Sequence, residues 1–414
     1  MSYIFKIDLS ENEYKNYLNS LEHYCIMQTK AWADVKKDWK STIVGMFDGE
    51  KLVAASLLLI RILPMGFKII YSPRGFIIDY NNDMILSNFI DFIKNYAKKI
   101  GAYIIRIDPE IIMSENNNGQ IKSVENGLNV LEKLKNAGFL HNGFAKDFQS
   151  YTQPRFYAQY HLFNKNNEKK SDDEILNSFD KKTRKYIGNY TKNRGIFFEN
   201  STRTEDIKDF YEISKYTETR QHILLRNQDY FERISRAFGE DCVLFFAKID
   251  LDRFLLYCED LKQKSNNNNA NDTEQTQIDD DIVQAKKIIE KHGKIVTLSA
   301  LLTIKSNDTA YLMYSGFNDE IFSKFRTTNQ IRFEAMKYFR DLEKSCKIFS
   351  FMGIDGNLND PLSEFKLKFN PEIIEYIGEF ELPVKKLSYK LMKNVFPFFK
   401  HLYIRTILFF KKKK

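Results

Sequence analysis

The first 150 residues alternate between two hydrophobic patterns. One long segment, Asp83–Ile100, carries apolar residues at helical spacing, and compact apolar runs on both sides of it are typical of strands. The expected strands are Lys51–Leu63, Lys68–Ser72, Gly75–Asp79 and Ala102–Ile107. Alternation of strands and helices along a chain is typical of an α/β architecture. The pattern therefore predicts an α/β subdomain over residues 1–150.

Elements of the same kinds follow in the second half of the chain. Helical spacing covers three segments, Glu205–Tyr216, Gln228–Phe238 and Asn329–Glu343. Apolar runs predict the strands Asp241–Ile249, Val296–Ile304, Thr309–Ser315 and Ile348–Met352, with a hairpin turn at Asn307-Asp308. We predict a second α/β subdomain from residues 151–251 and 295–381, and the shared order of elements is compatible with a duplication.

A polar insertion interrupts the second subdomain at residues 252–294. Asp252–Lys264 and Ile278–His292 have helical character, and the segment between them, Ser265–Gln275, is rich in asparagine. Such a segment cannot bury enough apolar surface to fold, so we expect a mobile tip. The pattern predicts a short helical hairpin; a plain surface loop with helical fragments is the alternative.

The segment 382–414 differs in composition from the rest of the chain. It has no acidic residue, and ten lysines and arginines alternate with leucine, isoleucine and phenylalanine. This pattern predicts a basic amphipathic helix, which is typical of a membrane surface. The alternative is a helix packed on the first subdomain with a solvated basic tail. We expect both: packing by the first part, and lipid contact by Phe409-Phe410 and Lys411–Lys414.

Charge and cysteine content narrow the choice of partners and sites. The 414 residues carry a net charge of +8, which suits phosphate-bearing partners such as nucleic acid, anionic lipid or nucleotide-linked substrates but does not choose among them. The four cysteines form no CxxC pair and the histidines have no ligand spacing, so we predict no metal site. Without an export signal or an apolar run of bilayer length, we expect a cytoplasmic protein, soluble or peripheral to the membrane.

Six local strings, in order over about 350 residues, resemble the FemABX peptidyltransferase family. They are Gln28–Trp39, Tyr103–Glu110, Phe179–Ile187, Arg226–Phe231, Tyr311–Gly316 and Glu364–Phe369, the last followed by a seventh family-like string, Glu375–Phe380. The resemblance implies an α/β fold of two tandem GNAT-like acyltransferase subdomains. It also implies a shortened helical arm at the insertion and a C-terminal helix that returns to the first subdomain.

The same resemblance implies an activity. Family members transfer an amino acid from aminoacyl-tRNA to an amine on the stem peptide of a peptidoglycan precursor, which builds the interpeptide bridge. The implied partners are aminoacyl-tRNA, lipid II or UDP-MurNAc-pentapeptide, and the anionic inner face of the cell membrane. No cofactor is implied, because an aminoacyl ester is already activated. Glycine, alanine and serine all remain open as the transferred residue.

Three residues match family positions at the reaction centre. Lys366, beside Phe365, is expected to place a cation near the transferred acyl group. Asp108 is expected to bind the acceptor amine or to accept its proton. Without the resemblance, Lys366 reads as an exposed lysine on a basic strand and Asp108-Pro109 as a common turn. The family positions that hold the precursor correspond to Lys36, Lys37, Tyr103, Arg226, Tyr230 and Tyr314.

Other residues have two interpretations. We expect Trp32 and Trp39 to anchor the core around the first helix, and Lys181–Arg194 either to follow a tRNA backbone or to form a solvated helix face. One departure concerns Pro361–Glu364, where family members often carry Gly-Leu-Tyr, so the acceptor pocket is expected to differ there.

Two rival functions use the same fold. A GNAT enzyme that uses acyl-coenzyme A needs a glycine-rich turn for the pyrophosphate, and the segment Gly316–Arg326 lacks it. A non-catalytic RNA- or membrane-binding relative would need neither Asp108 nor the Phe365-Lys366 pair.

Overall fold

The chain divides into two compact units. A computed structural model describes residues 3–63, 66–117, 119–147, 152–189, 194–221, 226–267, 272–321 and 325–393. The first unit contains Met1–Phe156, Asp355–Asn357 and Ile374–Lys414, and the second contains Tyr157–Ile354 and Leu358–Ile373, as far as these are described. The chain therefore leaves the first unit after Phe156 and re-enters it near its C-terminal end.

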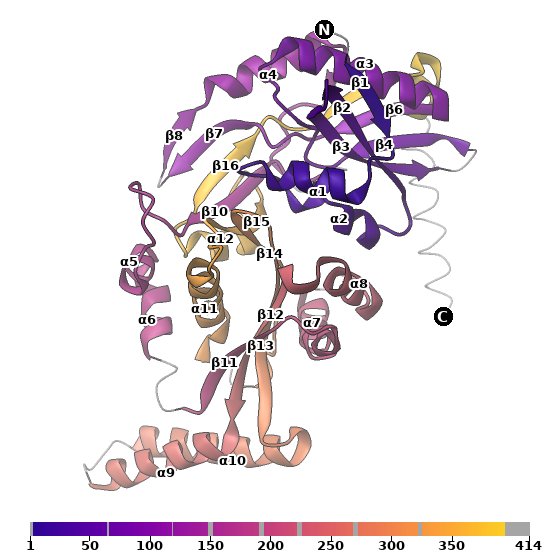
Figure 1. Ribbon diagram of the computed structural model, residues 1–414. Helices are drawn as coiled ribbons and strands as arrows, with labels where there is room; N and C mark the ends of the chain where they lie inside the picture. Colours follow the sequence, from indigo (N-terminus) through magenta and orange to yellow (C-terminus); the bar gives the residue numbers. More distant parts are fainter. Residues whose placement is uncertain are drawn as a thin grey trace. The chain divides into compact units, whose positions relative to one another are not determined.

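The first unit is built on a mixed sheet with the strand order β1-β2-β3-β4-β6-β17-β9, in which β5 also pairs with β3 (Figure 1). All pairs are antiparallel except β4 with β6. The strands are β1 (Ile4–Ile7), β2 (Lys40–Asp48), β3 (Lys51–Ile62), β4 (Lys68–Ser72), β5 (Ile77–Ile78), β6 (Ala102–Ile107), β9 (Leu140–His141) and β17 (Phe380–Pro383). An antiparallel hairpin joins β7 (Ile112–Asn117) to β8 (Gln120–Ser123).

The helices of the first unit cover this sheet with apolar faces. The longest, α3 (Asp83–Ile100), begins where the Asn82 side chain accepts hydrogen bonds from two backbone N–H groups and ends at Gly101, whose φ of 80° suits glycine. Its buried residues Leu86, Phe89, Ile90, Ile93 and Ala97 pack in one cluster with residues of β2, β3 and β6. The other helices are α1 (Glu11–Asn19), the 3-10 helix η1 (Ile26–Gln28), α2 (Lys30–Val35) and α4 (Glu125–Asn136).

The second unit has its own sheet, with the order β11-β12-β13-β14-β15-β10. These strands are β10 (Phe156–His161), β11 (Ile196–Ser201), β12 (Cys242–Asp250), β13 (Ile295–Lys305), β14 (Thr309–Phe317) and β15 (Ile348–Ile354); the chain then passes through β16 (Glu372–Tyr376) into the first unit. The helices are α5 (Asp172–Ser178), α6 (Lys181–Asn189), α7 (Ile207–Gln221), α8 (Gln228–Phe238), α11 (Thr327–Asp341) and α12 (Pro361–Leu367), with the 3-10 helices η3 (Thr204–Asp206) and η4 (Gly239–Asp241).

The two units repeat one succession of elements. In each, a strand and two helices precede three antiparallel strands, and a long helix then leads to a strand that runs parallel to the third. The first unit does this with β1-α1-α2-β2-β3-β4-α3-β6 and the second with β11-α7-α8-β12-β13-β14-α11-β15. The predicted repetition of element order is confirmed.

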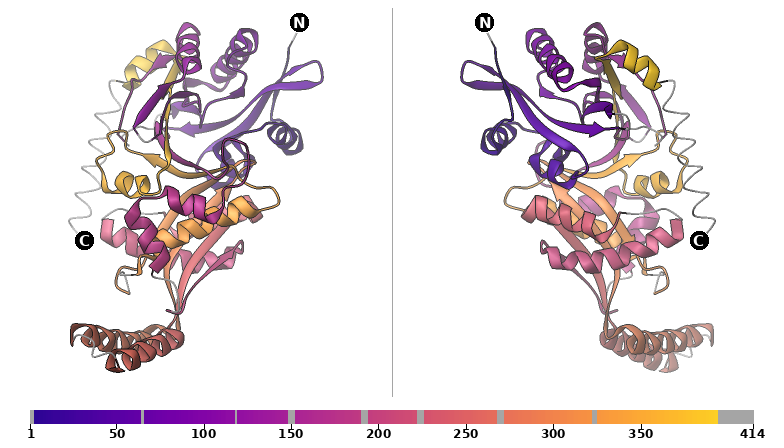
Figure 2. Two further views of the ribbon diagram at one scale, coloured as in Figure 1. Left: turned by 90° about the vertical axis from the view of Figure 1, so that its left-hand side faces the viewer. Right: turned by 90° about the vertical axis from the view of Figure 1, so that its right-hand side faces the viewer.

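The insertion in the second unit is a pair of helices between β12 and β13. α9 (Leu251–Asn267) and α10 (Asp272–His292) lie side by side at the ends of these strands, as both views of Figure 2 show. The core of the arm is apolar and includes Phe254, Cys258, Ile278, Ala285 and Ile288. The two helices extend into the segment predicted as a mobile tip, so that only residues 268–271 of it lie outside the described chain. The prediction that Ser265–Gln275 does not fold was wrong for both ends of this segment, because α9 continues to Asn267 and α10 begins at Asp272.

Two further predictions of secondary structure differ from the fold. Lys366 lies in the helix α12, which starts at Pro361 with Asp360 as its N-cap, and not on a strand. Leu382 and Pro383 belong to β17, and described helical residues begin only at 386. Residues 394–414, with the predicted lipid contacts Phe409, Phe410 and Lys411–Lys414, lie outside the described chain, as do residues 190–193 of the basic segment after α6.

We expect Gly316→Ala to destabilise the second unit. A Cβ atom at this position in β14 would lie 2.8 Å from the Ile213 carbonyl oxygen of α7, so the helix would have to move away from the sheet. Such overpacking costs about 1–3 kcal/mol. Hydrogen exchange of β13, β14 and α7 should report the lower opening free energy, whereas Ile295→Ala at an exposed position of β13 should leave it nearly unchanged. Unchanged exchange in Gly316→Ala would contradict the close approach.

Candidate functional site

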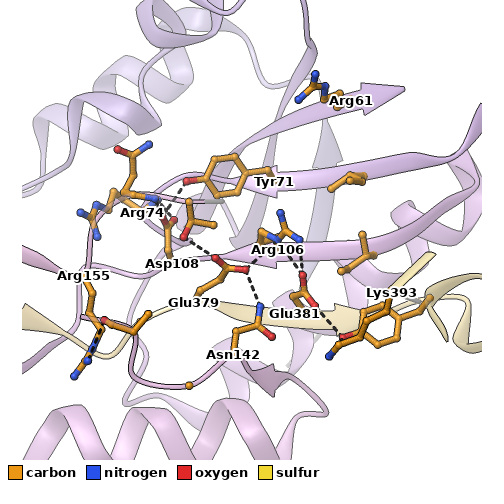
Figure 3. A pocket seen from close by; sticks show the side chains of 18 of the residues that line it. Arg61, Tyr71, Arg74, Arg106, Asp108, Asn142, Arg155, Glu379, Glu381 and Lys393 are labelled. Atoms are coloured by element: carbon orange, nitrogen blue, oxygen red, sulfur yellow. Dashed lines mark hydrogen bonds and ion pairs between the residues drawn. The ribbon is translucent and has the colours of Figure 1, made fainter. Parts of the chain in front are cut away.

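The first unit contains a polar cavity of about 670 Å³ along β4, β6 and β17 (Figure 3). Its lining combines aromatic rings with charged side chains of both signs. The lining residues include Trp39, Arg61, Tyr71, Arg74, Tyr103, Arg106, Asp108, Asn142, Thr152, Gln153, Glu379, Glu381, Tyr389 and Lys393. A cavity of this size, with convergent polar groups, is large enough for a small ligand or for part of a large one.

Asp108 lies in this cavity at the end of β6, where its carboxylate accepts three hydrogen bonds. The backbone N–H of Arg74 donates to Oδ1 at 2.7 Å, and the Tyr71 hydroxyl and the Gln153 N–H donate to Oδ2 at 2.9 and 2.8 Å. Burial raises the pKa of Asp108 to about 6, although the Arg74 charge and these donors act in the opposite direction. Both oxygens are thus engaged, so the residue ties β4 and the loops at residues 74 and 153 together.

Arg106 and two glutamates form the next part of the wall. Arg106 on β6 and Glu381 on β17 are direct partners in the sheet register, although 275 positions separate them in sequence. The Arg106 guanidinium donates to Glu381 and also lies 3.2 Å from Glu379. Burial lowers the pKa of this arginine, but the two carboxylates outweigh that effect and raise it, so Arg106 stays charged.

Side chains from three other segments complete this network. Asn142 Nδ2 and the Thr152 hydroxyl donate to Glu379 at 2.7 and 2.8 Å, and the Tyr389 hydroxyl donates to Glu381 at 2.8 Å. Lys393 in turn donates to the Tyr389 oxygen at 3.2 Å (Figure 3). The helical residues 386–393 therefore contribute directly to the cavity wall.

The aromatic side of the cavity corrects one prediction. Trp32 is buried in α2, as expected of a core residue, but Trp39 is only partly buried and lines the cavity. Its ring lies 6.4 Å from that of Tyr71, and the Arg61 guanidinium lies 5.4 Å over it. The expectation that Trp39 anchors the core was wrong, because the chain between α2 and β2 turns its ring toward the polar cavity.

Of the nine predicted site residues, only Asp108 and Tyr103 line this cavity. Lys36 ends α2 and lies with its Nζ 4.5 Å over the Trp32 ring, and Lys37 is exposed. The other five belong to the second unit. Asp108 and Lys366 were both expected at the reaction centre, and because they belong to different units this shared site remains a prediction.

Phe365 and Lys366 are neighbours on α12 of the second unit. Lys366 Nζ is partly buried and donates a hydrogen bond to the Gly353 carbonyl of β15 at 2.7 Å. Burial and the nearby Arg332 charge lower the pKa of Lys366 to about 7, against a smaller opposite effect of Asp360. The amine is thus close to half-protonated at neutral pH, which an exposed lysine would not be.

Three predicted residues gather in a second cluster of the same unit. The Arg226 guanidinium lies 5.1 Å over the Tyr230 ring, and the Tyr230 and Tyr314 hydroxyls are 3.5 Å apart. Tyr314 and Ser315 are consecutive in β14, so their side chains leave opposite faces of the sheet. Ser315 accepts a hydrogen bond from Arg332, which contacts Phe365. The Arg226–Tyr230–Tyr314 cluster and the Phe365–Lys366 pair thus lie on opposite sides of β14.

Sequence reasoning missed several residues that shape these sites. Arg106 and Glu381 each interrupt an apolar strand with a single charge, and such a charge signals a buried partner. Arg332 gave no comparable signal, because it lies in an amphipathic helix among other charged residues.

The described residues contain no group of three or more histidine, cysteine or acidic side chains that could hold a metal ion. Among the described helices, none has the length and apolar character needed to cross a membrane.

We expect Asp108→Asn to destabilise the first unit by about 1–3 kcal/mol at about pH 4, because the amide nitrogen cannot accept a hydrogen bond as the carboxyl oxygen that it replaces can. The folded-state pKa of about 6 exceeds that of the unfolded chain, so the contribution of Asp108 is fully present below about pH 4 and is lost as the pH rises through 6. The difference in free energy of unfolding between wild type and variant should therefore shrink between pH 4 and pH 6.5.

Urea unfolding followed by tryptophan fluorescence measures this difference, since both tryptophans lie in the first unit. Asp48→Asn, at an exposed position of β2, is the matched control and should change neither stability nor its pH dependence. A pH-independent effect of Asp108→Asn would show that the carboxyl group titrates normally.

Comparisons with known proteins agree with the architecture and with the sequence resemblance. The chain is 29% identical to the lipid II:glycine glycyltransferase of Staphylococcus aureus strain USA300 and, separately, to that of strain MRSA252, over 95% of this chain and 96% of each relative. A crystal structure of FemX is 26% identical, covers 95% of this chain and 100% of its own, and has a TM-score of 0.76. With the repeated element order, this likeness confirms the predicted fold class of two tandem GNAT-like α/β subdomains with an inserted helical hairpin. A model of the FemAB family matches residues 9–395, and the chain belongs to that family.

Proposed function

We propose that this protein transfers an amino acid from aminoacyl-tRNA to an amine on the stem peptide of a peptidoglycan precursor. The relatives named above are lipid II:glycine glycyltransferases, so lipid II is the first acceptor to test and glycine the first amino acid. Alanine and serine are the alternatives for the transferred residue. The match along nearly the whole chain supports the same overall reaction.

The chemistry requires little of the protein beyond placement and charge. An aminoacyl ester reacts with an amine once the amine is uncharged and once the developing oxyanion is stabilised. Lys366 carries this proposal, because it is a partly buried amine whose pKa lies near 7, fixed by the Gly353 carbonyl beside the Phe365 ring. We propose that Lys366 lies beside the transferred acyl group and that Phe365 packs next to it.

The cavity of the first unit suits a part of the precursor that carries both polar and apolar groups. Rings such as Trp39, Tyr71 and Tyr103 can pack against a sugar or a peptide, and their polar atoms can donate hydrogen bonds. Arg61 and Lys393 add positive charge that suits phosphate or carboxylate groups. We propose that this cavity holds the acceptor and that Asp108 keeps its wall in place.

Further contacts with the two substrates are proposed outside this cavity. The proposed contacts with the precursor are Lys36, Lys37, Arg226, Tyr230 and Tyr314. The basic helix α6 remains a candidate for the tRNA backbone.

Membrane contact is proposed for the C-terminal helical segment. Leu387 and Leu391 are 85% and 51% exposed and lie one turn apart, next to Lys386 and Lys390. Apolar and basic residues in this arrangement are typical of a helix at an anionic membrane surface. We propose that the protein works there as a peripheral protein of the inner face.

Mass spectrometry tests the reaction directly. Lipid II incubated with the protein and charged total tRNA should gain the mass of one or more amino-acid residues, and the increment identifies the residue. Pretreatment with ribonuclease should abolish the gain. An unchanged lipid II together with a modified UDP-MurNAc-pentapeptide would move the acceptor to the nucleotide-linked precursor. A gain that requires acetyl-coenzyme A in place of tRNA would overturn the proposal.

Lys366→Met should abolish transfer and leave affinity for the precursor within about twofold, because the side chain acts on the reacting centre and not on distant parts of the substrate. Rates come from single-turnover assays, and affinity comes from titration with soluble precursor. Lys368→Met, at an exposed position next to the end of the same helix, is the matched control and should retain activity. Full turnover by Lys366→Met would remove this lysine from the mechanism.

A further inference from the structure

A buried arginine without an acidic partner lies next to Lys366. Arg332 of α11 is 6% exposed, and its guanidinium donates to the Thr328 carbonyl at 2.6 Å and to the Ser315 hydroxyl at 3.0 Å. Its Nε atom has no hydrogen-bond partner, and no carboxylate of the described residues forms an ion pair with it. Burying an unpaired charge is costly, so such an arrangement is typical of a functional site.

The position of Arg332 relative to the Phe365-Lys366 pair is specific. Its guanidinium carbon lies 4.8 Å over the Phe365 ring, and this cation–π contact holds the ring against α11. Phe365 packs in turn on Phe369, with ring centroids 5.6 Å apart, which holds α12 to the core of the unit. Arg332 thereby sets the position of α12, and with it the position of the Lys366 amine.

The charges around Lys366 are few and known. Among the described residues, Arg332 acts on it from α11 and Asp360 from the N-terminus of α12, and the Gly353 carbonyl of β15 accepts its hydrogen bond. Asp360 is occupied as the N-cap, with Oδ1 accepting from the Leu362 and Ser363 N–H groups. The positive charge of Arg332 is therefore the stronger of the two influences on Lys366.

We propose that Arg332 is a positioning residue that holds the Phe365-Lys366 pair in place and keeps the Lys366 amine available in its neutral form as a proton acceptor. The inference rests on the proposed transfer function and adds to it. A neutral amine can still donate one hydrogen to Gly353 while its lone pair points elsewhere. Burial of the Lys366 amine, together with the Arg332 charge, lowers its pKa and maintains this state against the smaller opposite effect of Asp360.

The proton balance of the step is then complete. The acceptor ammonium gives one proton to the Lys366 lone pair, and the resulting amine forms the new C–N bond at the ester carbonyl. The ester C–O bond breaks, and the leaving ribose oxygen takes the proton from protonated Lys366. The second proton lost by the amine goes to solvent, so that Lys366 returns to its neutral form.

The test compares pH profiles of kcat/KM for wild type, Arg332→Gln and Arg332→Lys. The wild-type profile should rise with a midpoint near pH 7. In Arg332→Gln the midpoint should move up by about one pH unit, which lowers the rate about tenfold below pH 6 and restores it at high pH. Arg332→Lys keeps the charge, so its midpoint should stay close to the wild-type value.

A merely structural role would give a different result. Loss of packing lowers the plateau at every pH and leaves the midpoint unchanged, and that outcome in Arg332→Gln would overturn the proposal. Asp360→Asn supplies a change of opposite sign, since the amide oxygen can still cap α12 while the negative charge is lost. Its midpoint should move down, and this variant decides the matter if Arg332→Gln does not fold.

A measurement without substrates separates this inference from the proposed function. An amine-selective acylating reagent labels only neutral lysines, and mass spectrometry of the peptide with Lys366 gives the midpoint of labelling against pH. The midpoint should move up in Arg332→Gln even if no transfer to lipid II is detected. An unmoved labelling midpoint would refute the inference and leave the transfer activity unaffected.

Discussion

Arg106 and Glu381 hold together the two ends of the first unit. One lies on β6 and the other on β17, and their register places a charge pair between two otherwise largely apolar strands. Without Glu381 and Glu379, Arg106 would be a costly buried charge, and without Arg106 the two carboxylates would repel each other. The pair fixes β17 beside β6, and the cavity wall formed by Tyr389 and Asn142 depends on this register.

The protein treats buried charges in two opposite ways. Arg106 has two carboxylate partners that keep it charged, and the three hydrogen bonds that Asp108 accepts offset part of the effect of its burial. Among the described residues, Arg332 and Lys366 donate to carbonyl and hydroxyl groups, and burial lowers the pKa of both; for Lys366 the Arg332 charge adds to this effect and outweighs Asp360. Arg106 and Asp108, with their partners, form part of the cavity wall. The unpaired charge of Arg332 instead helps to keep the Lys366 amine neutral. This contrast separates a residue that shapes a pocket from one suited to move a proton.

The sequence predicted the elements better than the sites. The predicted helix Asp83–Ile100 and the predicted strand Ala102–Ile107 have the same bounds in the structure, because the spacing of their apolar residues fits only one type of element. Trp39 was misassigned because a tryptophan between a helix and a strand can face either core or cavity, and spacing does not decide this. Arg332 was missed because its importance comes from the absence of a partner, which depends on contacts between α11, β14 and α12.

The resemblance identified the sequence strings shared with the family, but it did not show which of their residues lie together in the folded protein. Tyr314 and Lys366 belong to neighbouring strings, yet β14 separates their clusters, because consecutive side chains of a strand point to opposite faces. The pairing of Arg106 with Glu381 was equally beyond local patterns, since contacts between positions this far apart follow from topology alone.

The placement of β17 between β6 and β9 has a consequence for synthesis on the ribosome. Chains emerge from the N-terminus, and domains usually fold in that order. Here the N-terminal unit lacks an internal strand until Phe380–Pro383 has left the exit tunnel, by which time every strand of the order β11-β12-β13-β14-β15-β10 is already available. The later-encoded unit can thus mature first, and a truncated chain that stops before Phe380 would leave the edges of β6 and β9 unpaired and prone to association.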